Sequence, residues 1–224
     1  MKQPTRSPGA LISFEGLDGC GKTTQLELEA QRLLGEGRVV KATKEPGGTP
    51  VGQKIREIVL NSANGPLCAS TELALMLAAR AQHIHELIRP AMESGVVVLC
   101  DRFSDSTVAY QGYGRGVPLE QLETLDGILC HSFRPDLTLR LDIDPETAAE
   151  RTGSRNHAAL QKETRFEDEG LAFFRRVQQG YHAIAHSDAC RVRLVDGRGS
   201  IAEVHERIKR LVDEFLSARP RRKK

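Results

Sequence analysis

The fold is decided by Gly16-Leu17-Asp18-Gly19-Cys20-Gly21-Lys22-Thr23, which has the G-x-x-x-x-G-K-[ST] spacing of a phosphate-binding loop. Its glycines allow backbone N–H groups to turn inward around phosphate oxygens, and the helix that follows adds the positive end of its dipole. Lys22 can reach the β- and γ-phosphates of a nucleoside triphosphate, and the Thr23 hydroxyl can ligate Mg²⁺. The loop therefore predicts a P-loop protein that binds a nucleotide for phosphoryl transfer.

Strands and helices alternate along the rest of the chain. Ala10 to Glu15 is predicted as a short buried strand before the loop, and Thr23 to Leu34 as a helix after it. Further strands are predicted at Val39 to Thr43, Val96 to Cys100, Leu137 to Asp142 and Val192 to Val195. Helices are predicted at Val51 to Leu60, at Thr71 to Ser94, with a break near Pro90 as an alternative, and at Ile201 to Leu216. This pattern predicts an α/β fold: a P-loop NTPase-type doubly wound parallel sheet of about five strands, flanked by helices, with a short lid.

The composition is that of an ordinary globular domain, with 39% hydrophobic and 28% charged residues in a chain of 224. A net charge of +2 argues against a protein devoted to coating nucleic acid. We expect a flexible segment at 1–9, a single domain at 10–217 with a lid at about 151–166, and a basic tail at 218–224. A solvated end is the simpler interpretation of the tail, and a weak polyanion contact is the alternative.

The cysteines and the hydropathy favour a cytoplasmic protein. The five cysteines are odd in number and no two lie close together, so they suggest neither a disulfide framework nor a zinc site. No stretch has the pattern of a signal peptide or a membrane span. We therefore expect reduced thiols, a cytoplasmic location and no membrane partner.

Asp101-Arg102-Phe103 follows the apolar strand Val96 to Cys100. An acid at the carboxyl end of a buried strand is where a magnesium-organising carboxylate belongs. Arg102 can hold a second phosphate bidentately and with permanent charge. A strand-end ion pair is the alternative interpretation.

Polar residues that could bind an acceptor follow this motif. Ser106, Thr107, Tyr110 and Gln111 precede a glycine-rich stretch at 112–116 and could contact a base and a sugar. Arg80 lies upstream on a predicted helix, where two alanines before it permit a ligand to approach closely. A guanine-reading Asn-Lys-x-Asp element is missing from the sequence, which argues against a GTPase.

Taken together, the motifs resemble those of bacterial thymidylate kinases, in that family's order from Leu11 to about Glu206. The matching stretches are Phe14 to Gln25, Glu45-Pro46-Gly47-Gly48-Thr49, Ala78-Ala79-Arg80-Ala81-Gln82-His83, Asp101-Arg102-Phe103, Ala109-Tyr110-Gln111-Gly112 and Arg134-Pro135-Asp136-Leu137-Thr138. The resemblance implies a nucleoside-monophosphate kinase that transfers the γ-phosphate of ATP to dTMP, giving dTDP, with Mg²⁺ as cofactor. It also implies a homodimer formed through helices; the stretch Leu73, Leu75 and Leu77 is compatible with either core or interface.

The resemblance also implies roles for individual residues. Arg102 would hold the dTMP phosphate and Arg56 would add a second cation near it, while Asp101 would organise the magnesium shell with Thr23. Arg80 would hydrogen-bond the thymine carbonyl, with Thr107 beside it, and Tyr110 would lie against the deoxyribose. The remaining substrate residues would be Glu45, Pro46, Met76, Ser106 and Gln111, and the ATP site would comprise Gly16, Leu17, Asp18, Gly19, Cys20, Gly21, Lys22, Thr23, Thr24 and Arg198.

The segment from Arg151 to Glu167 resembles the family's lid. Members of this family carry the arginine that clamps the transferring phosphate either in the P-loop or in the lid. Here Gly19 occupies the P-loop position, so the clamp is expected from the lid. Arg155 is the first choice for this catalytic role and Arg151 the second.

Three positions depart from the family's pattern. Met76 stands where an aromatic side chain usually stacks on thymine, Lys44 replaces an arginine before Glu45, and Thr164 replaces an aspartate in the lid. Met76 is the best support for an alternative, a P-loop kinase acting on another nucleoside monophosphate or on a nucleoside. A nucleotide-dependent switch protein is a second alternative, which would hydrolyse slowly and need no acceptor.

Overall fold

The computed structural model describes residues 9–158, 165–166 and 169–219, and the backbone alone for 152–158. A five-stranded sheet lies at its centre, with the order β2-β3-β1-β4-β5. The strands are β1 (Ala10–Glu15), β2 (Val40–Lys44), β3 (Val97–Asp101), β4 (Leu137–Asp142) and β5 (Val192–Asp196). Every pair is parallel, so the predicted fold class and all five predicted strands are confirmed.

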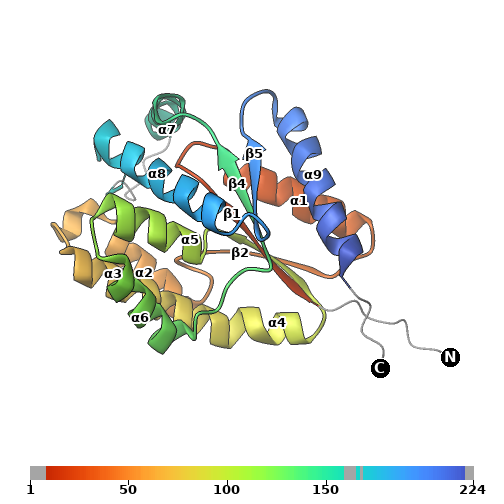
Figure 1. The fold of residues 1–224 in the computed structure, drawn as a ribbon, viewed down its shortest axis with the longest axis horizontal. Helices are drawn as coiled ribbons and strands as arrows, with labels where there is room; N and C mark the ends of the chain where they lie inside the picture. The colour runs from red at the N-terminus through yellow and green to blue at the C-terminus, as the bar shows by residue number, and fades with distance from the viewer. Residues whose placement is uncertain (1–8, 159–164, 167–168, 220–224) are drawn as a thin grey trace.

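The helices that connect these strands cover both faces of the sheet (Figure 1). They are α1 (Lys22–Gly35), α2 (Pro50–Leu60), α3 (Ala69–His83), α4 (Arg89–Glu93), α5 (Ser104–Thr107), α6 (Leu119–Cys130), α7 (Pro145–Ala158), α8 (Leu171–Ser187) and α9 (Ile201–Ala218). Three further helical elements are the 3-10 turn η1 (Ser62–Asn64) and the π-helical segments η2 (Ile84–Ile88) and η3 (Val108–Gly114).

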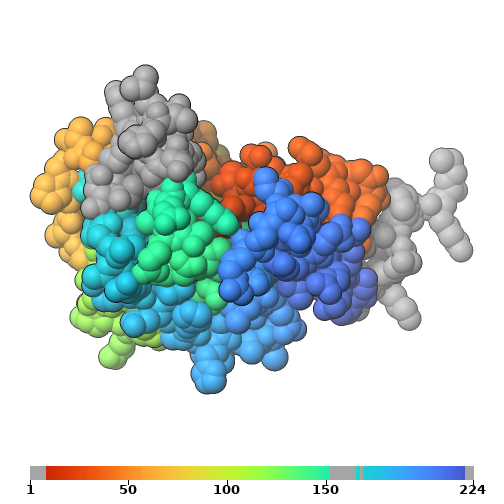
Figure 2. Space-filling view, turned by 90° about the horizontal axis from the view of Figure 1, so that it is seen from above, coloured from red at the N-terminus to blue at the C-terminus, as the bar shows by residue number. Residues whose placement is uncertain are grey.

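Successive side chains of β1 point to opposite faces of the sheet, so they contribute to two separate parts of the hydrophobic core. Ile12 and Phe14 pack in one cluster with the buried face of α1 and α9, whereas Leu11 packs in a second cluster with α3 and η2. All of β1 is buried because it is the central strand and has helices on both sides. In Figure 2 the helix α9 (blue) lies beside α1 (orange), and the start of α7 (green) lies beside α8 (cyan).

The central position of β1 determines where the candidate site lies on the sheet. Its neighbours are β3 and β4, with Phe14 opposite Asp101 and Leu139. Because the strands are parallel, their carboxyl ends meet at one edge, and the chain order reverses beside β1. The phosphate-binding loop after β1 and the Asp101-Arg102 motif after β3 therefore lie next to each other.

Three features differ from the expectation. The helix predicted from Thr71 to Ser94 starts at Ala69 and does not break at Pro90; it continues through a π-helical segment at Ile84–Ile88 into α4, whose first turn contains Pro90. The glycine-rich stretch at 112–116 begins inside the π-helical segment η3. The first part of the predicted lid is helical, because α7 extends to Ala158.

The two ends of the chain lie largely outside the described residues, as do 159–164 and 167–168 of the predicted lid. Arg219, from the predicted basic tail, is described: it pairs with Asp136 at 3.0 Å and donates to the carbonyl of Gly9 at 2.9 Å. That residue therefore belongs to the folded domain. Among the described helices, none combines the length and the apolar character needed to cross a bilayer.

Candidate active site

The phosphate-binding loop connects the end of β1 to the start of α1. Gly16, Gly19 and Gly21 have φ angles of 141°, 82° and 95°, in the region that side chains disfavour. A Cβ on Gly16 would also lie 2.5 Å from the carbonyl oxygen of Leu141. The glycine spacing is therefore a steric requirement of this loop, and α1 begins directly after it with its N–H groups directed at the loop.

Lys22 and Thr23 are the two functional side chains at the start of α1. Lys22 is buried, and its Nζ donates to the carbonyls of Gly16 and Leu17 at 3.2 and 2.8 Å. Thr23 Oγ1 donates to Asp101 Oδ2 at 2.5 Å. The loop and the end of β3 thus present a cation and a pair of hard oxygen atoms side by side.

The oxygen pair suits Mg²⁺, which prefers oxygen ligands and keeps several waters when it binds a nucleotide phosphate. No cluster of three or more His, Cys, Asp or Glu side chains that could hold a metal occurs within the described part of the chain. A site of one hydroxyl and one carboxylate agrees with a metal that arrives with a nucleotide and takes its remaining ligands from phosphate and water.

A cavity of about 540 Å³ lies beside this loop. All ten residues predicted to bind the acceptor line it: Glu45, Pro46, Arg56, Met76, Arg80, Arg102, Ser106, Thr107, Tyr110 and Gln111. The lining also includes Asp18, Gly19, Gly21, Lys22, Thr23, Thr24, Asp101 and Arg151. The structure therefore brings the phosphate loop and the predicted acceptor residues to one space.

Four residues of the predicted ATP site do not line the cavity. Gly16, Leu17 and Cys20 are buried parts of the loop itself, where they contribute backbone and packing. Arg198 lies after β5, pairs with Asp196 at 2.8 Å and is 74% exposed, so it is not part of this cavity.

Arg102 occupies the centre of the cavity wall. Its φ is 67°, which is unusual for a residue other than glycine. One terminal nitrogen donates to Gly16 O, Ser106 Oγ and Tyr181 OH, and the other donates to Asp18 Oδ1 at 2.7 Å and to Tyr110 OH at 3.1 Å. The guanidinium also lies over the ring of Tyr110, 4.8 Å from its centroid.

Two carboxylates next to Arg102 have opposite pKa shifts. Burial alone would raise the pKa of Asp18, but Arg102 and Lys22 beside it hold that pKa well below its usual range. Burial raises the pKa of Glu15 to about 7, and the nearby Asp105 adds to the rise, although Ser106 and Arg102 oppose it. Asp18 is thus a firmly charged partner for Arg102, and Glu15 is a carboxylate that titrates near neutral pH.

Arg80 lies deeper in the cavity within a chain of buried polar contacts. Its Nε donates to Glu45 Oε2 at 2.8 Å, and one terminal nitrogen donates to Thr107 Oγ1 at 2.6 Å and to the carbonyl of Phe103 at 3.1 Å. His83 contacts the other oxygen of Glu45 at 2.9 Å and Thr43 at 2.8 Å. The second terminal nitrogen of Arg80 makes no hydrogen bond within the described residues; it forms a longer ion pair with the buried Asp126, 3.6 Å from its Oδ1.

The remaining acceptor residues surround these two arginines. Gln111 donates to Glu72 at 2.9 Å, and Arg56 donates to the carbonyl of Pro46 at 3.1 Å. Met76 is half-buried and presents its side chain to the cavity. Tyr110 meets Phe166 edge to face, with the ring centroids 5.5 Å apart.

The two predicted lid arginines differ in what the structure describes. Arg151 is exposed on α7 and lines the cavity. The backbone of Arg155 lies one turn further along α7, but its side chain is outside the described residues, as is Thr164. The choice between Arg151 and Arg155 stays a prediction.

The sequence analysis assigned no role to several residues of this site. Phe103, Leu60 and Phe166 line the cavity, and Phe166 is placed there by Arg165, whose backbone N–H donates to Leu60 O and whose Nε donates to Val59 O. Glu15 and Tyr181 contact Arg102 or its hydroxyl partners. Glu15 could have been predicted from the sequence, because it is a carboxylate at the end of a fully buried strand. Tyr181 could not, because it is far away in the sequence and belongs to no motif.

The thymidylate kinase family model matches residues 14–208 of this chain. Two similar curated relatives are thymidylate kinases from Pelobacter propionicus, 46% identical over 89% of this chain and 92% of the relative, and from Pelotomaculum thermopropionicum, 45% identical over 94% and 95%. A crystal structure of thymidylate kinase from Ehrlichia chaffeensis superposes with a TM-score of 0.73 at 30% identity, covering 92% of this chain and 99% of that one. The family that the motifs predicted is therefore confirmed, and the chain belongs to the thymidylate kinase family.

Proposed function

We propose that this protein transfers the γ-phosphate of ATP to dTMP, giving dTDP and ADP, as a step toward dTTP. The single observation that carries the mechanism is the shared cavity, in which a phosphate loop and Arg102 meet beside β1. An ATP-dependent nucleoside-monophosphate kinase of the thymidylate type follows from the family membership. The comparisons do not favour a kinase for another acceptor.

On the donor side, the loop backbone and Lys22 bind the β- and γ-phosphates. Lys22 now donates to two loop carbonyls, and a triphosphate would offer its Nζ charged acceptors instead. Thr23 and Asp101 would hold Mg²⁺, which when bound neutralises the charge that develops between the β- and γ-phosphates. These residues position the donor; they form no covalent bond to it.

On the acceptor side, Arg102 binds the phosphate of dTMP. Its guanidinium is paired with Asp18, and a doubly charged phosphate is a stronger partner that can displace one of these bonds. Arg56 adds a second positive charge near that phosphate. Because two polyanions must meet in line, this convergence of cations is what the chemistry requires.

The base and sugar occupy the deeper part of the cavity. Arg80, held by Glu45 and Thr107, would donate a hydrogen bond from its guanidinium to a thymine carbonyl. Met76 covers one face of the base with its polarizable side chain. Tyr110 lies against the deoxyribose and disfavours a 2′-hydroxyl; Ser106, Gln111 and Pro46 complete the walls.

An arginine from the lid completes the site. Arg155 is our first choice for the clamp on the transferring phosphate and Arg151 the second. In either case closure over the cavity would exclude water and suppress ATP hydrolysis.

We further propose a cytoplasmic homodimer. The apolar side chains Leu125, Ile128 and Leu129 are exposed at helical spacing on α6, and α6 packs against α3. Leu73 and Leu77 are buried in the core and cannot supply that interface, whereas Leu75 is half-buried. Sedimentation of the wild type against Ile128→Glu tests this proposal, and a wild-type monomer would contradict it.

The proposed reaction is tested by following ADP formation from ATP and Mg²⁺ with and without dTMP, and by separating the products. We expect ADP and dTDP to appear in equal amounts and only when dTMP is present. ADP formation that does not depend on dTMP would instead support the switch protein.

A further inference from the structure

We propose that Tyr181 is a positioning residue of the acceptor site: its hydroxyl, oriented by Glu15, holds Arg102 in the direction that the acceptor phosphate requires. This inference rests on the proposed role of Arg102. Tyr181 belongs to α8, far from the loop and from β3 in the sequence, and none of the motifs that define the donor and acceptor sites includes it.

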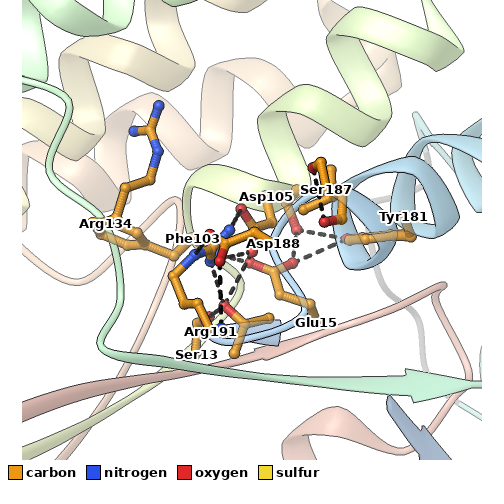
Figure 3. A network of polar contacts seen from close by, with 12 residues as sticks. Ser13, Glu15, Phe103, Asp105, Arg134, Tyr181, Ser187, Asp188 and Arg191 are labelled. Carbon is orange, nitrogen blue, oxygen red and sulfur yellow. Dashed lines mark hydrogen bonds and ion pairs between the residues drawn. The ribbon is translucent and has the colours of Figure 1, made fainter. Parts of the chain in front are cut away.

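The contacts join three elements at one buried point. Tyr181 is 2% exposed and Glu15 is 0% exposed. The hydroxyl of Tyr181 lies 3.0 Å from Glu15 Oε2, 2.9 Å from Ser106 Oγ and 3.2 Å from a terminal nitrogen of Arg102. Figure 3 shows Tyr181 reaching Glu15 from α8, with Asp105 on the other side of Glu15.

The number of protons sets the direction of these hydrogen bonds. Glu15 Oε2 accepts from Ser106 Oγ at 2.5 Å and from Tyr181 OH at 3.0 Å, so each hydroxyl donates its single proton to the carboxylate. Both hydroxyl oxygens are then left with lone pairs only, and both accept from the same nitrogen of Arg102, at 3.1 and 3.2 Å. That nitrogen also donates to Gly16 O at 3.1 Å, so its two hydrogens are shared among three acceptors. Glu15 thus turns two hydroxyl dipoles toward the guanidinium.

The backbone at Arg102 also depends on Glu15. The φ of Arg102 is 67°, in a sparsely populated region. Glu15 Oε1 also accepts the backbone N–H of Phe103 at 2.7 Å, so one carboxylate restrains both the main chain after Arg102 and the hydroxyls around its guanidinium. Removal of one hydroxyl leaves the main-chain restraint in place.

The neighbouring polar cluster shows that the Tyr181 hydroxyl is not what anchors α5. Asp105, on that helix, accepts from Arg191 at 2.7 Å (Figure 3). It also accepts from Thr138 at 3.0 Å, and Thr138 lies 2.8 Å from Ser13. Those contacts do not involve Tyr181. The ring of Tyr181 also packs edge to face on Tyr110, 6.5 Å between centroids, and a phenylalanine would keep that contact.

The test compares dTMP with thymidine, which has the same base and sugar but no phosphate. Dissociation constants are measured by calorimetry for the wild type, Tyr181→Phe and Tyr113→Phe, at about pH 8, where Glu15 is ionised. We expect Tyr181→Phe to weaken dTMP binding about tenfold, as for a lost hydrogen bond to a charged group, and to leave thymidine binding unchanged. In turnover, the KM for dTMP should rise while the KM for ATP stays the same.

Tyr113→Phe is the matched control, because Tyr113 is half-buried in η3 and its hydroxyl makes no hydrogen bond to another described residue. Equal weakening of dTMP and thymidine, no change in either, or the same effect in Tyr113→Phe would overturn the proposal. If Tyr181→Phe does not unfold cooperatively, Glu15→Gln carries the test. Its amide has one acceptor oxygen and one NH2 donor, so it cannot accept both the Phe103 N–H and the two hydroxyl protons as the carboxylate does. An unchanged preference for dTMP over thymidine in that variant overturns the proposal. Failure of the proposed reaction is distinguishable, because it would appear as dTMP binding without turnover in the wild type.

Discussion

The donor and acceptor sides of this cavity are built in different ways. The donor side is one continuous run from Gly16 to Thr23, shaped by three glycine φ angles and by the start of α1. The acceptor side draws on α2, α3, η3 and the loop after β3, and its central contacts join residues as far apart as Glu45 and Arg80. A local motif therefore specifies how phosphate is bound, and only the tertiary fold specifies what receives it.

Arg102→Ala should give the largest difference between the effect on the acceptor side and the effect on the donor side of the cavity. It removes the cation at the acceptor phosphate, and we expect dTMP turnover to fall by about 10³-fold, as when a charge stabiliser of phosphoryl transfer is removed. ATP binding should change much less: Arg102 contacts the loop through Gly16 O and Asp18, but Lys22 keeps its own bonds to the carbonyls of Gly16 and Leu17. Turnover and ATP affinity are measured together with a thermal unfolding curve; near-normal turnover would remove Arg102 from the site.

The lid arginine should give the next largest effect. Arg155→Ala is expected to lower kcat on the order of 10²-fold, because the clamp acts on charge that develops in the transition state. Its effect on the KM for dTMP should be smaller. Arg151→Ala is the paired variant, and if it alone lowers kcat, the clamp is Arg151.

Glu15→Gln should change how stability depends on pH. The pKa of Glu15 is about 7 in the folded protein against an ordinary value of 4.5, so the folded state binds the extra proton between these values. The stability that this proton contributes is present below pH 4.5 and is lost as the pH rises through about 7.

Between pH 4.5 and about 7, the free energy of unfolding of the wild type should therefore fall by about 3 kcal/mol relative to that of Glu15→Gln. Urea unfolding at several pH values measures the difference, with Glu27→Gln, at an exposed position of α1, as the control. Parallel pH curves for the wild type and Glu15→Gln would be inconsistent with a raised pKa.

Met76→Ala should give the smallest effect, confined to the acceptor side. Met76 is half-buried against the cavity, and loss of its side chain should raise the KM for dTMP by roughly tenfold, as for a few lost apolar contacts. The KM for ATP should not change, and Met76→Leu should restore most of the dTMP affinity. An effect on ATP would mean that Met76 does not belong to the acceptor side.

The sequence was sufficient to predict those parts of the fold and site that depend on residues close together in the chain. All five strands, the phosphate loop and its helix could be predicted, because apolar runs and glycine spacing act through near neighbours. The ten acceptor residues also converge on the cavity. Six of them were predicted from residue type and position, whereas Glu45, Pro46, Arg56 and Met76 came from the family resemblance alone.

What could not be predicted depends on distant contacts. Tyr181 reaches Arg102 from α8, and Phe166 is placed by bonds from Arg165 to the end of α2. The π-helical segments η2 and η3 also had no clear sequence signal, since their residues are ordinary helix formers and glycines whose backbone follows the packing around them.

The most direct measurement is a panel of acceptors assayed with ATP and Mg²⁺: dTMP, dUMP, UMP, dCMP, dAMP and thymidine. If the acceptor side is assembled as described, dTMP should have the highest kcat/KM. UMP should be disfavoured by Tyr110, and thymidine should not be phosphorylated, because Arg102 would have no phosphate to hold. Equal turnover of several monophosphates, or a preference for another one, would contradict the assignment of the acceptor side.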